Sequence, residues 1–487
     1  MTPLAAQAQA QPVSLADRIN DTLTPVADGV SSVIFYSVDV LGVSLPLVVV
    51  WLMAAGVILT VALGFVNLRG FGHGWSLLLK PRHQSDAPGE ISHFQALSAA
   101  LSGTVGLGNI ASVPVAITLG GPGAIFWMMV AGFFGMSAKF AECALAVKYR
   151  RELPDGRILG GPMLYIEAVF KRRGLGWLGK AAAVFFAIMA MGASVSVFQV
   201  NQSHAQFANV TGISAPVIFG VIMATGVAAI VLGGIRRVGA AARLIVPVMG
   251  LIYVGAALVI LAMHVDAIPA AVNTIVQSAF GLDAAGGGLV GALINGMKRA
   301  TYSSEAGVGS AAIAHAAVKT KEPMTEGYVA LLEPFIDTIV VCSLTGLVVI
   351  VTGVYEPYLF DPDVVGIEIT SAAFASAFSW FPYLLLVASM LFAFSTLVSW
   401  AFYGSQAAAY LFGPSRTTDV VFKLTLCLLL STGAAVSLSA ILDFIDSMLF
   451  GMAIPNIIAL YLLLPELKQE VAAYHRRRNA AREAAEQ

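Results

Sequence analysis

The sequence predicts an all-α polytopic membrane protein with about eleven transmembrane helices, two of which are interrupted near their middle. Composition is the first observation behind this prediction. Of the 487 residues, 58% are hydrophobic and 11% are charged, and the mean hydropathy is +0.83. Soluble proteins carry about 25% charged residues.

The second observation is a series of apolar runs of about 20 residues, the length that crosses a bilayer as a helix. The third is that glycine and small polar residues interrupt two of these runs, at Ser102–Asn109 and Tyr302–Ser310.

The apolar runs divide the chain into an N-terminal segment, 1–44, a transmembrane region, 45–466, and a C-terminal tail, 467–487. The tail is rich in Ala, Glu and Arg, which is typical of a solvated helix. The three cysteines fall inside apolar runs and are expected to act as small packing residues. The predicted spans lie near 45–66, 94–119, 122–148, 177–204, 214–233, 241–263, 286–315, 327–353, 379–411, 419–440 and 443–465.

Lys and Arg residues predict the orientation, because cytoplasmic loops carry an excess of them. One set of alternate loops is basic, while the opposite loops have no Lys or Arg between the spans and hold acidic residues instead. The C-terminus is therefore expected in the cytoplasm and the N-terminus outside. The basic loops carry Arg69, Lys80, Arg82, Lys148, Arg150, Arg151, Arg157, Lys171–Arg173, Lys180, Arg236, Arg237, Arg243, Lys319, Lys321, Arg416, Lys423, Lys468 and Arg476–Arg478.

The first ten residues resemble the end of a signal peptide, with small residues at A-x-A spacing but no basic or long apolar region before them. A disordered Ala/Gln-rich terminus is an equally good interpretation. Residues 11–44 are expected to form an amphipathic stretch outside the membrane.

The spans after the first divide into two sets of five, 94–263 and 286–465. Each set begins with one of the two interruptions, and the sets have opposite predicted orientation. This arrangement predicts a five-plus-five inverted repeat preceded by one extra helix, a pattern typical of secondary transporters. The prediction rests on hydropathy, orientation and the matching interruptions, since the two halves show no visible identity.

Both interruptions offer chemistry for a ligand. In lipid a helix breaks only where its freed backbone groups find protein, water or a ligand. Gly106 and Gly108 permit non-helical backbone and close approach, and the half-helix that follows presents free N–H groups to an anion such as a carboxylate. The carbonyl groups of about Ser102 to Val105, at the end of the preceding half-helix, suit a small cation. Close helix packing is the alternative role for these glycines.

The second interruption adds charge. Lys298, Arg299 and Glu305 lie near the middle of their span, where an ionised side chain facing lipid is costly, so they are expected to face protein or water. Tyr302–Ser304 are expected to supply ligand-contacting backbone, and Glu305 to hold the cavity together through Lys298, Arg299 or backbone donors. A buried structural ion network is the preferred interpretation of Lys298 and Arg299.

Two further spans supply polar groups at the same depth. The hydroxyls of Ser395 and Thr396 can complete a cation shell begun by the carbonyls near Ser102 and Val105. Hydroxyl and carbonyl oxygens with little formal charge suit sodium better than a divalent ion. Gln199 and Asn201 lie two residues apart, so one of them is expected to face the cavity.

Several runs together resemble the alanine or glycine:cation symporter family of bacterial amino-acid carriers. The resemblance covers about residues 45–465 and implies the five-plus-five fold of the neurotransmitter:sodium symporters and a location in the bacterial inner membrane. It departs from the usual pattern at Leu107, Ser112 and Ser304, where Thr, Gly and Asn are common. The runs that carry it are Phe94–Leu97, Val105–Ile110, Gly121–Met128, Lys139–Glu142, Ser303–Ser310, Phe335–Thr338 and Phe392–Thr396.

The resemblance implies a symporter that takes up a small neutral amino acid with sodium by alternating access. The implied sodium ligands are the carbonyls of Ser102 and Val105 and the hydroxyls of Ser395 and Thr396. Trp400, one turn beyond Thr396, is expected either to close the cavity or to pack as a structural aromatic. The implied substrate contacts are Thr104, Gly106, Gly108, Asn109, Gln199, Tyr302 and Ser303.

Other functions remain as alternatives. Proton coupling through Glu305, Glu142 or Asp337 is the main rival, followed by a channel or facilitator and by a receptor-like sensor. An enzyme is not expected: the run Gly174–Lys180 resembles a phosphate loop, but Ala181 lacks the hydroxyl that binds magnesium. No cofactor is expected beyond the coupling ion. The net charge of −1 gives no support for nucleic-acid binding, so the expected partners are the amino acid, sodium and membrane lipid, with the oligomeric state open.

Overall fold

The protein is a helical bundle in the computed structural model, which describes residues 25, 28–40, 43–79, 87–281, 288–360, 366–435 and 438–486. Within these residues, six helices are long and apolar enough to cross a membrane, and two more pairs of helices qualify as spans bent at a short break. The predicted class, an all-α membrane protein of many spans, is confirmed. The count of eleven helices and the inverted repeat stay predictions. The signal-like residues 1–10 lie outside the described residues.

The first elements form a short hairpin and a bent helix pair. Strands β1 (Ser37–Val40) and β2 (Val43–Pro46) pair antiparallel, and α2 (Leu47–Ala62) follows directly. The chain then bends by 63° into α3 (Val66–Arg69) and α4 (Phe71–Leu79).

The next group contains the first predicted repeat. It begins at a capping box in which Ser92 and Gln95 satisfy each other's backbone N–H groups. Its elements are α5 (His93–Thr104), the π-helix η1 (Gly108–Ser112), α6 (Val113–Gly120), α7 (Ala124–Tyr149), β3 (Arg151–Glu152), β4 (Ile158–Leu159), α8 (Pro162–Lys171), α9 (Gly176–Ala193), α10 (Val197–Thr211), α11 (Pro216–Val231) and α12 (Gly234–Met263).

The last group contains the second predicted repeat and the long C-terminal helix. Its elements are η2 (Val265–Ala267), α13 (Ile268–Phe280), α14 (Gly288–Ser304), α15 (Ser310–His315), α16 (Pro323–Ala330), α17 (Leu332–Pro334), the π-helix η4 (Phe335–Cys342), α18 (Ser343–Thr352), η5 (Glu356–Tyr358), α19 (Gly366–Ala377), α20 (Phe381–Phe412), α21 (Arg416–Thr432), η6 (Gly433–Ala435) and α22 (Leu438–Glu486).

Both predicted interruptions are present, although the second begins later than expected. Helix α5 ends at Thr104, and the chain resumes at Gly108 with a bend of 47°. Helix α14 continues through Ser304, so Tyr302–Ser304 lie in its last turn and not in irregular backbone as predicted. The chain leaves the helix at Glu305, which has a φ of 51°, because Gly307 and Gly309 supply the positive φ values that the turn needs.

Three other features differ from the predicted spans. The span predicted over 177–204 lies within one stretch that is long and apolar enough to cross a membrane, Gly176–Thr211, but it consists of two helices, α9 and α10, separated at residues 194–196. Helices α13 and α19 occupy segments that were predicted to be loops. Helix α22 runs for 49 residues without a break at Pro455 or Pro465, so the helical tail expected at 467–487 is the continuation of the last span.

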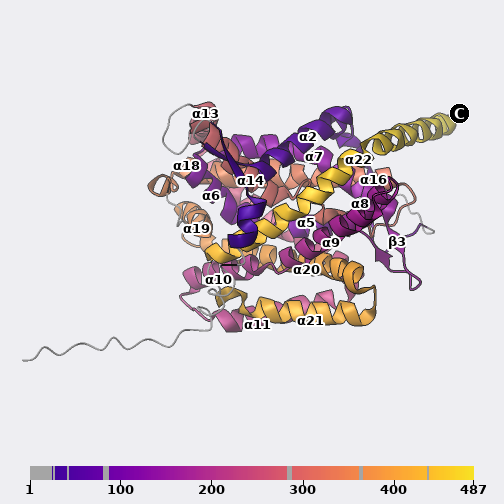
Figure 1. Ribbon diagram of the computed structural model, residues 1–487. Helices are drawn as coiled ribbons and strands as arrows, with labels where there is room; N and C mark the ends of the chain where they lie inside the picture. The colour runs from indigo at the N-terminus through magenta and orange to yellow at the C-terminus, as the bar shows by residue number, and fades with distance from the viewer. Residues whose placement is uncertain are drawn as a thin grey trace, which may run out of the picture.

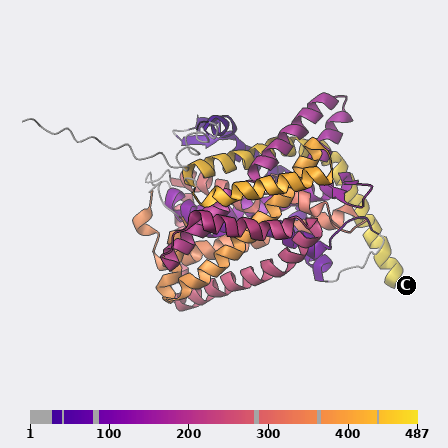
Figure 2. The same ribbon diagram turned by 90° about the horizontal axis from the view of Figure 1, so that it is seen from below.

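The bundle has two different ends (Figure 1). Strand β3 and the projecting end of α22 lie at one end, and α13 and α19 lie at the other, so the basic loop at 148–157 and the basic tail share an end. This agrees with the predicted separation of basic and acidic loops, although the structure contains no membrane. Figure 2 shows the long helices running side by side along the bundle. Helix α14 packs against α7, and α20 packs against α5, α9 and α12.

Candidate functional site

A small cavity lies where three interrupted helices meet. Its residues come from the α5 break, the α9–α10 break, the end of α14 and helices α20 and α22. A water-sized sphere can place its centre in about 30 Å³ of the cavity, which is room for about two waters. The cavity is therefore small. The lining residues are Gly103, Thr104, Gly108, Ala193, Ser196, Phe198, Gln199, Tyr302, Glu305, Thr396, Trp400, Ile445 and Leu449.

The backbone of the first break is held by side chains. The Gly106 N–H donates to the Asn109 side-chain oxygen at 3.1 Å, and the Leu107 N–H donates to Gln199 Oε1 at 3.2 Å. The Asn109 N–H donates to the Gly106 carbonyl at 3.2 Å. These bonds fix the start of η1, whose first residue, Gly108, lines the cavity beside the Tyr302 ring.

Of the seven predicted substrate contacts, Thr104, Gly108, Gln199 and Tyr302 line the cavity. Gly106 lies just behind the cavity wall, because a Cβ there would stand 2.6 Å from Thr396 Oγ1 and 3.2 Å from Gln199 Nε2. Asn201 is not among the cavity residues and accepts a hydrogen bond from Gln202, so Gln199 alone of that pair faces inward, as their spacing predicts.

Asn109 and Ser303, the other two predicted contacts, belong to a buried cluster around Asp337. The Asn109 amide donates to Asp337 Oδ1 at 2.6 Å, and the Ser303 hydroxyl donates to Asp337 Oδ2 at 2.5 Å. Asn109 also donates to Ser303 Oγ at 3.0 Å. Thr338 gives the carboxylate another donor at 2.8 Å. The cluster joins the first break to the last turn of α14, so these residues position the cavity wall in this structure.

Of the four predicted sodium ligands, Ser102 and Ser395 are in direct contact between α5 and α20. The Ser102 hydroxyl donates to the Ser395 carbonyl at 2.6 Å, and the Ser395 hydroxyl donates to the Phe392 carbonyl at 3.0 Å. Val105, the residue after α5, leaves the helical conformation with a ψ of 85° and is buried. Thr396 differs from the two serines: its hydroxyl is buried, lines the cavity and has no hydrogen-bond partner among the described residues.

The sequence alone did not predict the whole site. Ser399 was not among the predicted residues, yet its hydroxyl donates to the Ala99 carbonyl at 2.8 Å and to Ser102 Oγ at 3.0 Å, which ties α20 to α5. Ser196 and Phe198 line the cavity because α9 breaks at residues 194–196. The run Gly192-Ala-Ser-Val-Ser196 was the available signal, since it resembles the small polar runs at the other two breaks.

The apolar wall of the cavity consists of Phe198, Trp400, Ile445 and Leu449. The rings of Phe198 and Tyr302 meet edge to face, with centroids 5.9 Å apart. Trp400 lines the cavity and is 4% exposed. Leu107 and Ser304, where the chain departs from the family pattern, are not among the described residues that line the cavity.

The charges near the second break pair differently from the expectation. Lys298 and Arg299 contact Asp446 of α22, at 3.5 and 3.9 Å. A structural ion pairing was preferred for them from the sequence, and here Asp446 is buried while the Lys298 side chain is 27% exposed. Glu305 lines the cavity and accepts a hydrogen bond from Ser310, at the start of α15. Glu305 therefore stabilises the second break from within its own turn and not through Lys298 or Arg299.

Comparison with known proteins gives a consistent result. The model of the sodium:alanine symporter family matches residues 29–487. Sodium/alanine symporter AgcS of Methanococcus maripaludis is 39% identical over 442 residues, covering 90% of this chain and 96% of that protein. The probable sodium/glutamine symporter GlnT of Bacillus subtilis is 30% identical over 439 residues, covering 90% and 89%.

Two further matches extend this comparison. The putative sodium/proton-dependent alanine carrier protein YrbD of Bacillus subtilis is 34% identical over 404 residues, covering 80% of this chain and 82% of that protein. Among solved structures, MhsT in complex with L-phenylalanine superposes with a TM-score of 0.55 at 15% identity, covering 77% of this chain and 89% of that chain. The last match shows a shared fold.

Proposed function

Because this chain belongs to the sodium:alanine symporter family, we propose that it takes up a small neutral amino acid, alanine or glycine, together with sodium. Membership of this family and the fold shared with MhsT already identify a multi-pass, sodium-coupled amino-acid symporter. The observation that supports the finer proposal best is the small cavity at the three helix breaks, with a Thr396 hydroxyl in its wall that has no partner among the described residues.

The amino-acid site would use the first break and Gln199. Gly108 begins a helical segment at the cavity, and the amide end of a helix attracts a carboxylate. The substrate side chain would meet Phe198, Ile445 and Leu449, which leave little room beyond a methyl group. The small volume of the cavity supports alanine or glycine over larger amino acids.

The sodium site would lie between α5 and α20. The last carbonyl groups of α5 have no further helical N–H groups to accept from, because the helix stops at Thr104. Thr396 faces the same gap with a hydroxyl that has no partner among the described residues. An unpartnered buried hydroxyl costs about 1–3 kcal/mol. A bound sodium ion, held also by the Ser102 and Val105 carbonyls and by Ser395, would remove that cost.

Coupling would follow from the shared break. A sodium ion bound to the carbonyl groups of residues 102–105 would fix the conformation of the first break. The N–H groups that follow this break would then be in place to bind the carboxylate of the amino acid. Both ligands would then favour the same state of the first break, so each would raise the affinity for the other by the same factor. Alternating access to the two sides of the membrane would complete the cycle.

Substitution of Thr396 tests the sodium site. Thr396→Ala should raise the half-saturating sodium concentration by about tenfold, since loss of one ligand worth about 1.4 kcal/mol has that effect. The amino-acid preference should stay the same. Thr396→Ser, which keeps the hydroxyl, serves as the matched control and should retain most of the sodium affinity. An unchanged sodium response in Thr396→Ala would remove Thr396 from the ion site.

Transport measurements test the function itself. Purified protein in proteoliposomes should accumulate labelled alanine or glycine when a sodium gradient is imposed, and should fail to do so with a proton gradient alone. Larger amino acids should compete poorly, because the cavity is small. Uptake that is driven by protons and indifferent to sodium would overturn the proposal.

A further inference from the structure

At the end of the bundle predicted to be cytoplasmic, the chain before α5 is bonded to the chain after α15. The Glu90 N–H donates to the Ala317 carbonyl at 2.7 Å, and the Lys319 N–H donates to the Ile91 carbonyl at 2.8 Å. Ile91 and Val318 form an isolated parallel bridge. These segments, residues 88–93 and 316–320, lead into one broken helix and out of the other, and we refer to them together as the gate.

Arg150 holds both halves of the gate. Its Nη1 donates to the carbonyls of Ala316, at 2.8 Å, and Val318, at 2.5 Å. Its Nη2 donates to the carbonyls of Pro88, at 2.6 Å, and Thr320, at 2.9 Å. An arginine side chain stays charged at all physiological pH values. Arg150 is therefore the part of the gate that does not respond to pH.

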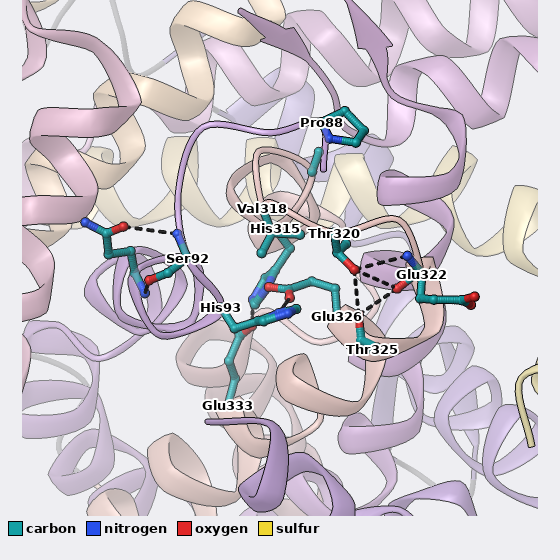
Figure 3. A network of polar contacts seen from close by, with 12 residues as sticks. Pro88, Ser92, His93, His315, Val318, Thr320, Glu322, Thr325, Glu326 and Glu333 are labelled. Carbon is teal, nitrogen blue, oxygen red and sulfur yellow. Dashed lines mark hydrogen bonds and ion pairs between the residues drawn. The ribbon is translucent and has the colours of Figure 1, made fainter. Parts of the chain in front are cut away.

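A second set of contacts in the gate can respond to pH (Figure 3). His93 is the first residue of α5 and His315 is the last residue of α15, and both contact the carboxylate of Glu326 on α16, through its two different oxygens. The other ring nitrogen of His315 contacts Glu333 Oε1 at 2.5 Å. One carboxylate thus links the near ends of the two broken helices.

These contacts require a proton beyond the neutral imidazole. A carboxylate is only an acceptor, and a neutral imidazole has only one N–H. His315 has a carboxylate oxygen against each nitrogen, so either both nitrogens carry hydrogen or one of the carboxyl groups does. In both cases the group formed by His315, Glu326 and Glu333 binds one proton more than a neutral imidazole beside two carboxylates.

The geometry indicates from which side this proton exchanges. The side chains of His315, Glu326 and Glu333 are fully buried, while the side chain of His93 is 18% exposed. Lys139 Nζ lies 3.2 Å from Glu333 Oε2 and supplies that carboxylate with a permanent cation. His93 is the member of this set that lies on α5 and reaches the surface, so its charge changes most directly with the gate. Other charged or titratable groups that interact with Glu326 or Glu333 are Lys139, Glu142 and Cys143 on α7, Arg150 after it, Glu305 at the second break and Tyr403 on α20.

We propose that His93, Glu326 and His315 form a proton-binding site that closes the cytoplasmic gate. The proton is bound while α5 lies against α16, and it leaves through His93 to the cytoplasm when α5 moves away. It rebinds from the same side on closure, so no proton crosses the membrane. This inference rests on the alternating access proposed above, and it makes the gate sensitive to cytoplasmic pH while sodium remains the coupling ion.

The sign of the effect follows from proton counting. In the closed gate the Glu326 carboxylate contacts the His93 ring and favours its protonated form, so the closed gate binds up to one proton more than the open gate and a rise in pH favours opening. A difference of one proton changes the equilibrium about tenfold per pH unit. Low cytoplasmic pH should hold the gate closed, and alkaline pH should release it.

Hydrogen exchange of the full chain in nanodiscs tests the gate without any transport. The amides of Glu90 and Lys319 are bonded across the gate. Their protection, corrected for intrinsic exchange, should fall about tenfold per pH unit in the alkaline range. His93→Gln keeps a donor for Glu326 but cannot be charged, so its protection should be nearly independent of pH. The control His264→Gln, on the opposite end of the bundle, should behave like the unchanged protein.

Two outcomes would overturn the inference. One is protection in the unchanged protein that does not vary with pH, and the other is a His93→Gln variant that keeps the full pH dependence. Arg150→Lys provides a second variant: a lysine cannot hold four carbonyls at once, so protection should fall at every pH while the pH slope remains. A loss of slope in Arg150→Lys would assign the pH response to Arg150 and would also overturn the inference.

Uptake separates this inference from the proposed function. With the outside pH and the sodium gradient held constant, sodium-driven uptake into proteoliposomes should change with the pH of the lumen in the unchanged protein and not in His93→Gln. Failure of the proposed function would abolish uptake in both and leave the exchange result intact. Net proton movement in step with uptake would contradict a proton that returns to its own side.

Discussion

Replacement of Gly106 by alanine should lower sodium-dependent uptake by about one to two orders of magnitude. A Cβ at this position would stand 2.6 Å from Thr396 Oγ1 and 3.2 Å from Gln199 Nε2. It would push away the free hydroxyl that we assign to sodium and the amide that holds the Leu107 N–H. Forcing a methyl group into a closely packed site costs about 1–3 kcal/mol, which corresponds to the expected loss.

The measurement is uptake by purified protein, together with the apparent melting temperature to show that the variant folds. Gly250→Ala is the matched control, because a Cβ there meets nothing within 4 Å and lies on a helix, α12, where alanine is favoured. It should leave uptake unchanged. If Gly106→Ala transported as well as Gly250→Ala, the first break could not be the ligand site.

Replacement of Lys139 by methionine should produce the largest loss of stability. Lys139 is completely buried, at 3.2 Å from Glu333 and 3.8 Å from Glu142. Removing the cation would leave two buried carboxylates without their shared partner, and breaking a buried ion pair in this way costs about 3–5 kcal/mol. The expected result is a strongly lowered melting temperature, or a loss of folded protein during purification.

Lys148 provides a control on the same helix. It pairs with Glu466 and Glu470 of α22 at 2.6 and 2.7 Å, but its side chain is 26% exposed. Partly exposed pairs contribute only about 0–1 kcal/mol, since water and salt screen them. Lys148→Met should therefore lower the melting temperature slightly. If Lys139→Met and Lys148→Met lowered the melting temperature equally, burial of the Lys139 ion pairs would not determine their contribution to stability.

The first break could be predicted from the sequence because its cause is local. Gly106 and Gly108 stand two apart inside an apolar run, with polar side chains beside them. Lipid offers no hydrogen-bond partner to the backbone of such a run, so the pattern indicates a break that faces protein, water or a ligand. The structure ends α5 at Thr104, within the predicted residues. The hydroxyls of Ser395 and Thr396 on α20 could be placed opposite this break from their depth in the predicted span alone, since both segments cross the same bilayer.

The second and third breaks show where local patterns fail. Tyr302–Ser304 are helical because the positive φ values begin only at Glu305 and continue at Gly307 and Gly309. The break between α9 and α10 has a weaker local signal, because Gly192 lies before Ser194–Ser196 and no glycine stands at the centre of the break. The small polar run resembles the other two breaks, but without the packing of α9 against α20 and α22 it also fits an ordinary part of a helix.

The roles of Asn109 and Ser303 depend on a partner distant in the chain. Both residues were predicted as substrate contacts, and that role stays a prediction. In the structure both donate to Asp337, which lies in the π-helical segment η4. A carboxylate buried in a span is readily noticed in a sequence, but the residues that satisfy it can be found only once three helices are placed together.

Because three interrupted helices meet at the cavity, the main chain of several segments lies beside the proposed amino-acid site, and three apolar side chains would meet the side chain of the substrate. Main-chain groups do not change when a residue is substituted. Substitution of Phe198, Ile445 or Leu449 could therefore change which amino acid is accepted. The main-chain groups proposed to bind the carboxylate and amine, which all amino acids share, would stay the same. Relatives of this chain that are named for alanine and for glutamine fit such a history of divergence around a constant backbone.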